Sequence, residues 1–128
     1  MMKKYKLLVK SLVSFMVHHG YTVRPLPQIV FHSKRQEDEV FIKTGYYDPN
    51  DMTVHIFTNG RHVKDILRSL AHELIHHKQN IDGRLGIGAY DGETIYNDKK
   101  LQKLEEEAYL NGNISFRTWT ELFKDKNI

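Results

Sequence analysis

The feature that most constrains the fold is a strong helical period in the middle of the chain, over residues 61 to 79. Apolar residues recur there every three or four positions and form a broad stripe: Val63, Ile66, Leu67, Leu70, Ala71, Leu74 and Ile75. A stripe of that width is typical of a helix that packs against other core elements. Asp65 suits a first helical turn, while Asn80 and Gly83 favour an end soon after residue 79. The segment therefore predicts a buried central helix.

The residues before this segment predict one helix and three strands. Residues 3 to 19 have helical spacing, and Gly20 favours an end there. Residues 28 to 32 form a short apolar run that is typical of a strand. Residues 40–47 and 52–58 are β-like, and the intervening Asp-Pro-Asn-Asp is a strong turn signal, so we expect an antiparallel hairpin.

The residues after the central helix predict a loop and two further helices. Residues 81 to 98 contain four glycines, which favour a loop. A helix is expected from about Lys99 to Leu110, ending near Gly112, and a last one from Ser115 through Phe123. The prediction is a single α+β domain over residues 1–128, with a small antiparallel or mixed sheet packed on the central helix and C-terminal helices.

Composition narrows the chemistry that this domain can carry. The 128 residues contain no cysteine, so a transition-metal site must use His, Asp or Glu. The net charge of +3 is spread along the chain, which favours a mixed solvated surface over a nucleic-acid-binding stripe. No run approaches the roughly 20 apolar residues of a membrane span, and the basic N-terminus lacks a cleavage site. We therefore expect a cytoplasmic protein without a membrane or nucleic-acid partner.

The central segment also carries the pattern H-E-x-x-H, as His72, Glu73 and His76. Residues four apart lie one turn apart on a helix, so the two imidazoles point the same way and can share one ion. Glu73 lies about 100° round the helix, where it is badly placed to bind that ion but well placed to reach a water molecule beside it. The spacing predicts a metal centre with His72 and His76 as ligands.

A catalytic zinc site needs a third protein ligand and an open fourth position. Asp82 is one candidate, but the motif that uses this spacing has a glycine where Gln79 stands. The acidic run on the following helix is the better source. There we interpret Glu105 as a solvated surface acid and favour Glu107 as the ligand, with Glu106 in reserve.

These residues resemble the zincin metallopeptidases of the gluzincin type, in which H-E-x-x-H is joined by a glutamate from a following helix. The family's ligand glutamate commonly stands just before an alanine, so the resemblance implies Glu107, which precedes Ala108. The run from Leu70 to Gly86 also looks like small peptidase-like proteins encoded by phages, which implies a host-cytoplasmic or virion location. The resemblance covers roughly residues 50 to 120 and implies a minimal zincin-like fold with an edge strand along the cleft. Met52–Thr58, which directly precedes the central helix, is the strand to which the resemblance assigns that position.

The function implied is a zinc-dependent peptidase with one Zn²⁺ per chain and a peptide or protein substrate. Glu73 would act as general base for a metal-activated water. A further donor is needed for the oxyanion, and Tyr96 or Tyr90 are favoured because the loop should border the cleft. His55, His77 and Arg117 stay open for that role. The alternative is a non-catalytic, zinc-stabilised interaction protein or virion component.

Overall fold

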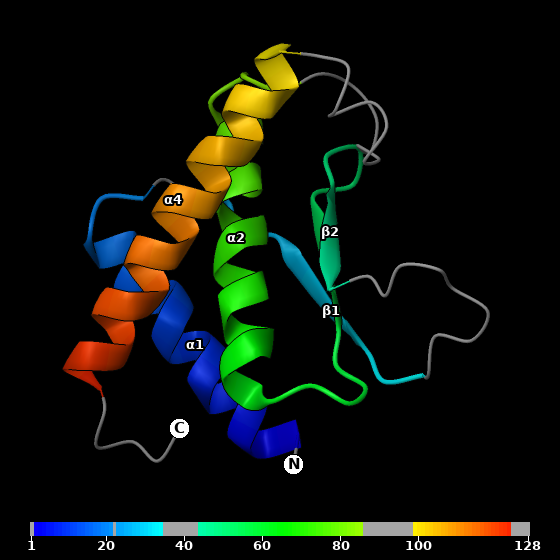
Figure 1. Cartoon of the computed structure of the whole chain (residues 1–128), viewed down its shortest axis with the longest axis vertical. Coiled ribbons are helices and arrows are strands. Elements are labelled where there is room, and N and C mark those ends of the chain that lie inside the picture. Colours follow the sequence, from blue (N-terminus) through cyan, green and yellow to red (C-terminus); the bar gives the residue numbers. More distant parts are fainter. Residues whose placement is uncertain (1, 22, 35–43, 86–98, 124–128) are drawn as a thin grey trace.

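A computed structural model of the chain describes residues 2–21, 23–34, 44–85 and 99–123, without the side chains of residues 2–4. Along these ranges the order of elements is α1 (Met2–His18), β1 (Gln28–His32), β2 (Gly45–Asp48), β3 (Thr53–Phe57), α2 (Val63–Ile81) and α4 (Lys99–Leu122). The predicted α+β class is confirmed, and α2 lies between the sheet and the other two helices (Figure 1). None of the helices in the described ranges is long and apolar enough to cross a bilayer.

The three strands form a mixed sheet in the order β1-β3-β2. The expected hairpin is confirmed, because β2 and β3 are antiparallel with Tyr47 opposite Val54. The other side of β3 pairs in parallel with β1, where Ile29 lies opposite Val54. The prediction that β3 is an edge strand is therefore wrong. Its second partner comes from a strand more than twenty residues away, which a local sequence pattern does not reveal.

The central helix α2 forms as its apolar stripe predicts. The His62 side chain accepts a hydrogen bond from the backbone N–H of Lys64 (3.1 Å) and so satisfies one unpaired donor of the first turn. Gly83, with a φ of 74°, follows the end of the helix. Between these ends Leu70, Ala71 and Leu74 are completely buried. Burial of this stripe fixes which side of α2 turns toward solvent.

Helix α4 runs without interruption for 24 residues, so the predicted break near Gly112 is wrong. Gly112 lies where α4 crosses α2, and a Cβ atom there would stand only 2.9 Å from the Cα of His72. Ala108 and Ser115, on the same side of α4, are also buried. Small side chains let the two backbones approach closely at this crossing. The glycine thus serves the packing of two helices and does not end one.

Candidate metal centre

His72 and His76 lie on the side of α2 that faces α4, where both imidazoles meet one carboxylate. The Nε2 atom of His72 is 2.7 Å from Oε1 of Glu105, and the Nε2 atom of His76 is 3.0 Å from Oε2. The two rings lie 5.0 Å apart between centroids. The predicted pair of neighbouring imidazoles is present, and it meets the side chain of Glu105.

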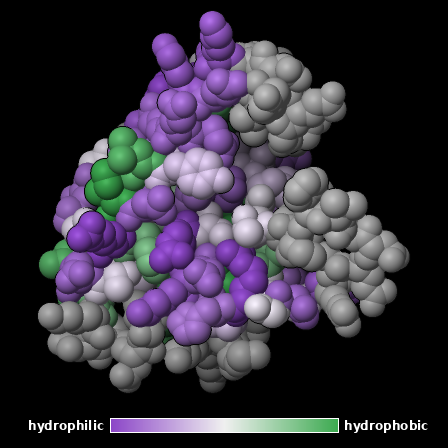
Figure 2. Space-filling view, in the orientation of Figure 1, coloured by the Kyte–Doolittle hydropathy of each residue, from purple (hydrophilic) through white to green (hydrophobic). Residues whose placement is uncertain are grey.

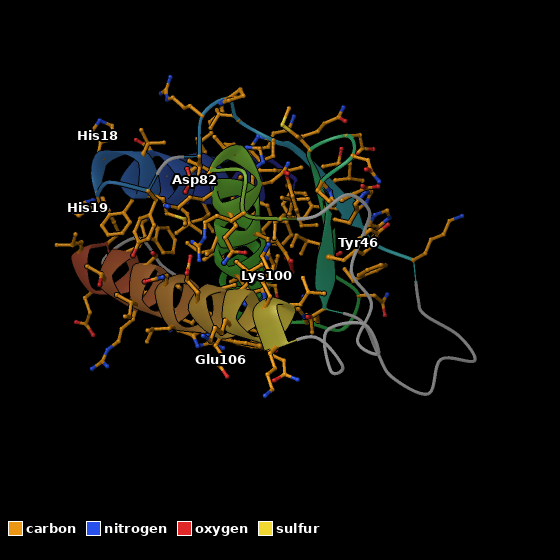
Figure 3. The ribbon with its side chains drawn as sticks, turned by 90° about the horizontal axis from the view of Figure 1, so that it is seen from above. His18, His19, Tyr46, Asp82, Lys100 and Glu106 are labelled. Atoms are coloured by element: carbon orange, nitrogen blue, oxygen red, sulfur yellow. The ribbon has the colours of Figure 1, made fainter. Side chains whose placement is uncertain are left out.

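Glu105 is a partly buried acid held by two histidines. Burial by itself would raise the pKa of Glu105, but hydrogen bonds and positive charge from His72 and His76 outweigh it and lower the pKa to about 2. The interpretation of Glu105 as a solvated surface acid is therefore wrong. Glu105 shares the α2-facing side of α4 with Ala108 and Gly112, three and seven positions on. Glu106, the reserve candidate, is exposed on the outer side of α4 (Figure 3).

Glu107, the expected third ligand, lies elsewhere. Its two carboxylate oxygens accept hydrogen bonds from Arg84 at 2.7 Å each, which gives a bidentate ion pair. Hydrogen bonds from Arg84 are the main cause of its lowered pKa. Two residues along a helix correspond to about 200° of rotation, so Glu107 cannot share the direction of Glu105. Glu107, the acid that directly precedes Ala108, is therefore not the carboxylate that meets the histidines.

Glu107 is linked to His76 by hydrogen bonds through Gln79, which is fully buried. The side-chain N–H₂ of Gln79 donates to the Leu104 carbonyl at 2.9 Å and to Glu107 Oε1 at 3.3 Å. With both donors engaged, its Oε1 atom is the acceptor that faces His76 Nδ1 at 2.9 Å. Nδ1 of His76 therefore carries a hydrogen, and Nε2 is the nitrogen that faces Glu105.

This tautomer makes the site fit a cation. A neutral His76 with hydrogen on Nδ1 would point the lone pair of Nε2 at the Glu105 carboxylate, which is repulsive. The contact is favourable only when Nε2 bears a proton or shares a metal ion with the carboxylate. Burial lowers the pKa of His76, but the hydrogen bond to Glu105 and the nearby acids outweigh it, so the pKa is raised. Two imidazole nitrogens and a carboxylate are also a donor set that zinc prefers.

Glu73 adjoins this group and is buried, with 7% of its surface exposed. The ligand atoms of His72, Glu73 and His76 lie within 4.8 Å of one another. Burial raises the pKa of Glu73. The nearby His76 and His72 lower it and the negative charge of Glu105 raises it, and the net shift is upward. On the sheet side, a Cβ atom on Gly45 would stand 3.7 Å from Glu73 Cγ. Strand β2 therefore passes directly beside the Glu73 side chain.

A cleft opens between β2, α2 and α4 at this point. Its walls come from the start of β2, from two turns of α2 and from the middle of α4: Thr44, Gly45, Arg68, Ser69, His72, Glu73, Glu105, Tyr109 and Asn113. The Tyr109 ring packs edge-on against His72, with 4.4 Å between centroids. Burial, followed by the charges of Glu105 and Glu73, raises the pKa of Tyr109.

The other candidates for the site lie elsewhere or outside the described residues. Tyr96 and Tyr90 are outside them. Asp82 caps the end of α2 and pairs with Lys78 at 2.7 Å. His55 stacks on Tyr46, which lies on the side of the sheet away from α2 (Figure 3).

Arg117 and His77 also lie away from the cleft. Arg117 lines grooves farther along α4. His77 is completely buried, with Nε2 donating to the Pro25 carbonyl at 2.6 Å and Nδ1 accepting from the Tyr47 hydroxyl at 2.7 Å. These bonds fix His77 as a neutral structural group, and burial lowers its pKa.

Comparisons of the chain with protein-family models, with curated proteins and with solved structures found no match to any of them. What is established is a buried His72-Glu73-His76 group on α2 with the spacing of an H-E-x-x-H motif. Sequence reasoning missed Tyr109 and Gln79. The signal for Tyr109 was its position one turn after Glu105. The signal for Gln79 was its place three residues after His76, on the same side of α2.

Proposed function

We propose that the chain is a zinc-dependent peptidase with His72, His76 and Glu105 as the three protein ligands. The observation that carries the proposal is the convergence of both Nε2 atoms on one carboxylate, with the Nδ1 hydrogen of His76 tied to Gln79. The third ligand is Glu105 in place of Glu107, because Glu107 is engaged by Arg84.

His72, His76 and Glu105 would hold the zinc ion, which would supply Lewis acidity that lowers the pKa of a water molecule toward neutrality and polarises a carbonyl. Glu73 acts as general base. It takes the proton of the attacking water and then delivers it to the departing amine. Burial raises the pKa of Glu73, so its carboxylate binds a proton more tightly than that of a solvated glutamate.

Tyr109 supplies the further donor that the oxyanion needs. Its ring rests on His72. A tyrosine hydroxyl, with an ordinary pKa of about 10, is protonated at neutral pH, and burial raises the pKa of Tyr109 further. A protonated phenol beside the ligands can donate a hydrogen bond to the oxygen that gains charge as the carbonyl is attacked. This role was expected of Tyr96, and Tyr109 takes it in the proposal because it lines the cleft.

The edge strand beside the cleft favours a peptide substrate. Among the residues that the structure describes, strand β2 pairs with β3 on one side only, and Thr44 and Gly45 at its start line the cleft next to Glu73. A free strand edge can pair with an extended peptide through backbone hydrogen bonds. Such pairing would align the substrate backbone along the site, so the partner proposed is an unfolded segment of a peptide or protein.

The test has a metal arm and an activity arm. Protein purified without added metal is analysed for zinc, and one zinc per chain, lost in His76→Ala, is expected. A quenched-fluorescent peptide library then measures hydrolysis by the zinc-loaded chain. Glu73→Gln should keep the zinc and lose activity by roughly a hundredfold to ten-thousandfold. Zinc binding without hydrolysis, or activity untouched by Glu73→Gln, would instead support the zinc-stabilised interaction protein.

A further inference from the structure

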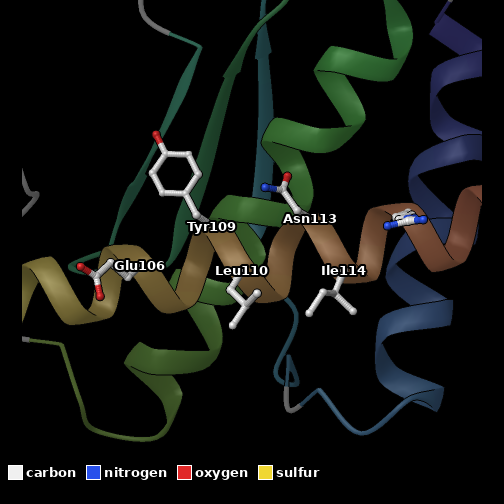
Figure 4. A pocket seen from close by; sticks show the side chains of 6 residues that line it. Glu106, Tyr109, Leu110, Asn113 and Ile114 are labelled. Atoms are coloured by element: carbon white, nitrogen blue, oxygen red, sulfur yellow. The ribbon is translucent and has the colours of Figure 1, made fainter.

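The outer face of α4 exposes aliphatic side chains next to one another. Leu110 and Ile114 are 61% and 47% exposed, although they lie one turn apart near the middle of the helix. Both point away from α2, on the other side of α4 from Tyr109 (Figure 4). Figure 2 shows hydrophobic patches over α4 within a largely hydrophilic face. Single exposed aliphatics are ordinary, but a pair at this spacing makes a continuous ridge.

Charged residues flank this ridge in a self-complementary order: when the helix is reversed, each base falls opposite an acid. Lys103 and Glu106 precede it and Arg117 and Glu121 follow it, and all four are exposed. Lys103 and Glu121 stand nine positions before and after Gly112, and they are five full turns apart, so they point the same way. Glu106 and Arg117 stand six and five positions from Gly112 and differ by only about 20° in direction. Leu110 and Ile114 stand two positions on either side of it.

We propose that two copies of this chain pair through α4 in an antiparallel arrangement, with the two-fold axis beside Gly112. Leu110 then packs against the partner's Ile114. Glu106 meets the partner's Arg117, and Lys103 meets the partner's Glu121. Every contact occurs twice, as a two-fold interface requires. The inner face of α4 stays on α2 through Ala108 and Gly112, so one helix serves both contacts.

The charge order selects this partner and this direction. A parallel pair would place Glu106 against Glu106 and Arg117 against Arg117, which is repulsive. Binding of an unrelated partner could use acids and bases on α4, but it would not require those charges to be complementary about a two-fold axis beside Gly112. Because one helix face is small beside the roughly 800 Å² that each partner of a stable complex buries, the dissociation constant should be in the range of roughly 10–100 μM.

The experiment is sedimentation equilibrium of the full chain at low ionic strength, from about 1 μM to about 1 mM. A concentration-dependent dimer is expected, and Leu110→Lys should abolish it. Leu122→Lys is the matched control, because Leu122 is equally exposed on the same helix (60%) but lies about 120° round from Leu110. Since all of these positions are exposed, circular dichroism should show that every variant is folded.

Charge reversal tests the antiparallel register separately. Glu106→Arg alone, and Arg117→Glu alone, should each weaken dimerisation roughly tenfold, because each turns two attractive pairs into repulsive ones. The double variant Glu106→Arg/Arg117→Glu should regain the original affinity. The proposal is overturned by a chain that stays monomeric throughout the range. It is equally overturned by a dimer that Leu110→Lys leaves intact, or by a double variant as weak as the single ones.

Discussion

Replacing Gly112 by alanine tests whether the close crossing of α2 and α4 builds the metal centre. The new Cβ atom would stand 2.9 Å from the Cα and 3.1 Å from the backbone N of His72. Contacting carbon atoms normally lie about 3.5–4.0 Å apart, so the two helices must separate by roughly 0.6–1 Å. Both of the crowded atoms belong to the backbone of a packed helix, so no side chain can turn aside to relieve the contact.

Two opposing effects set the size of the change in stability. Alanine in place of glycine inside a helix stabilises by about 0.5–1 kcal/mol when nothing obstructs it. Overpacking a core usually costs about 1–3 kcal/mol. We therefore expect a net loss of about 1 kcal/mol in the free energy of unfolding, which corresponds to a fall in Tm of about 4 °C for a domain of this size.

The same displacement should weaken the metal site. Glu105 lies on α4 and His72 on α2, so moving the helices apart lengthens the 2.7 Å contact between them. We expect zinc affinity to fall roughly tenfold, as is typical when ligand positioning is disturbed. Urea denaturation with a chelator present measures the stability of the metal-free chain, and competition with a chromogenic chelator measures zinc affinity.

The control is Thr118→Ala, an exposed position on the same helix. It should gain about 0.5 kcal/mol from helix propensity alone and leave zinc affinity unchanged. If Gly112→Ala behaved in the same way as this control, more stable and with full zinc affinity, the close crossing would not position the ligands.

Four other outcomes follow from the same contacts. Glu105→Gln should reduce zinc affinity about a hundredfold or more, whereas Glu107→Gln should reduce it about tenfold, since Glu107 acts only through its support of the site; competition titration measures both. Tyr47→Phe removes the donor to His77 Nδ1 and should cost about 1–3 kcal/mol in urea denaturation. Arg84 lowers the pKa of Glu107 from its ordinary value of 4.5. The ion pair between them therefore stabilises the fold above that pH, and this stabilisation is lost as the pH falls further. With chelator present, the stability of wild type should therefore fall more steeply than that of Arg84→Gln as acid is added from pH 6 downward; parallel curves would remove this contribution. Adding a chelator to the zinc-loaded chain should lower its Tm, and an unchanged Tm would argue against a metal bound to the native state.

The acidic run on α4 shows what a sequence motif can predict about the third ligand and what it cannot. The pattern before Ala108 favoured Glu107, and the helix that carries the run forms as predicted from Lys99 onward. Which acid faces the histidines depends on the rotation of α4 about its own axis. That rotation is set by the small residues Ala108 and Gly112 at the crossing with α2. The position of Gly112 is a sequence signal for this rotation, but a glycine there is equally typical of the end of a helix.

Local periodicity by itself determined the central helix, its buried stripe, the alignment of His72 with His76 and the β2–β3 hairpin. These features depend on residues within a few turns or one hairpin, where spacing dictates direction. Only the tertiary structure decided that Glu105 meets the histidines, that α4 continues past Gly112 and that β3 is flanked on both sides. Each of these depends on the distance and rotation between segments far apart in the chain, which no single segment's pattern specifies.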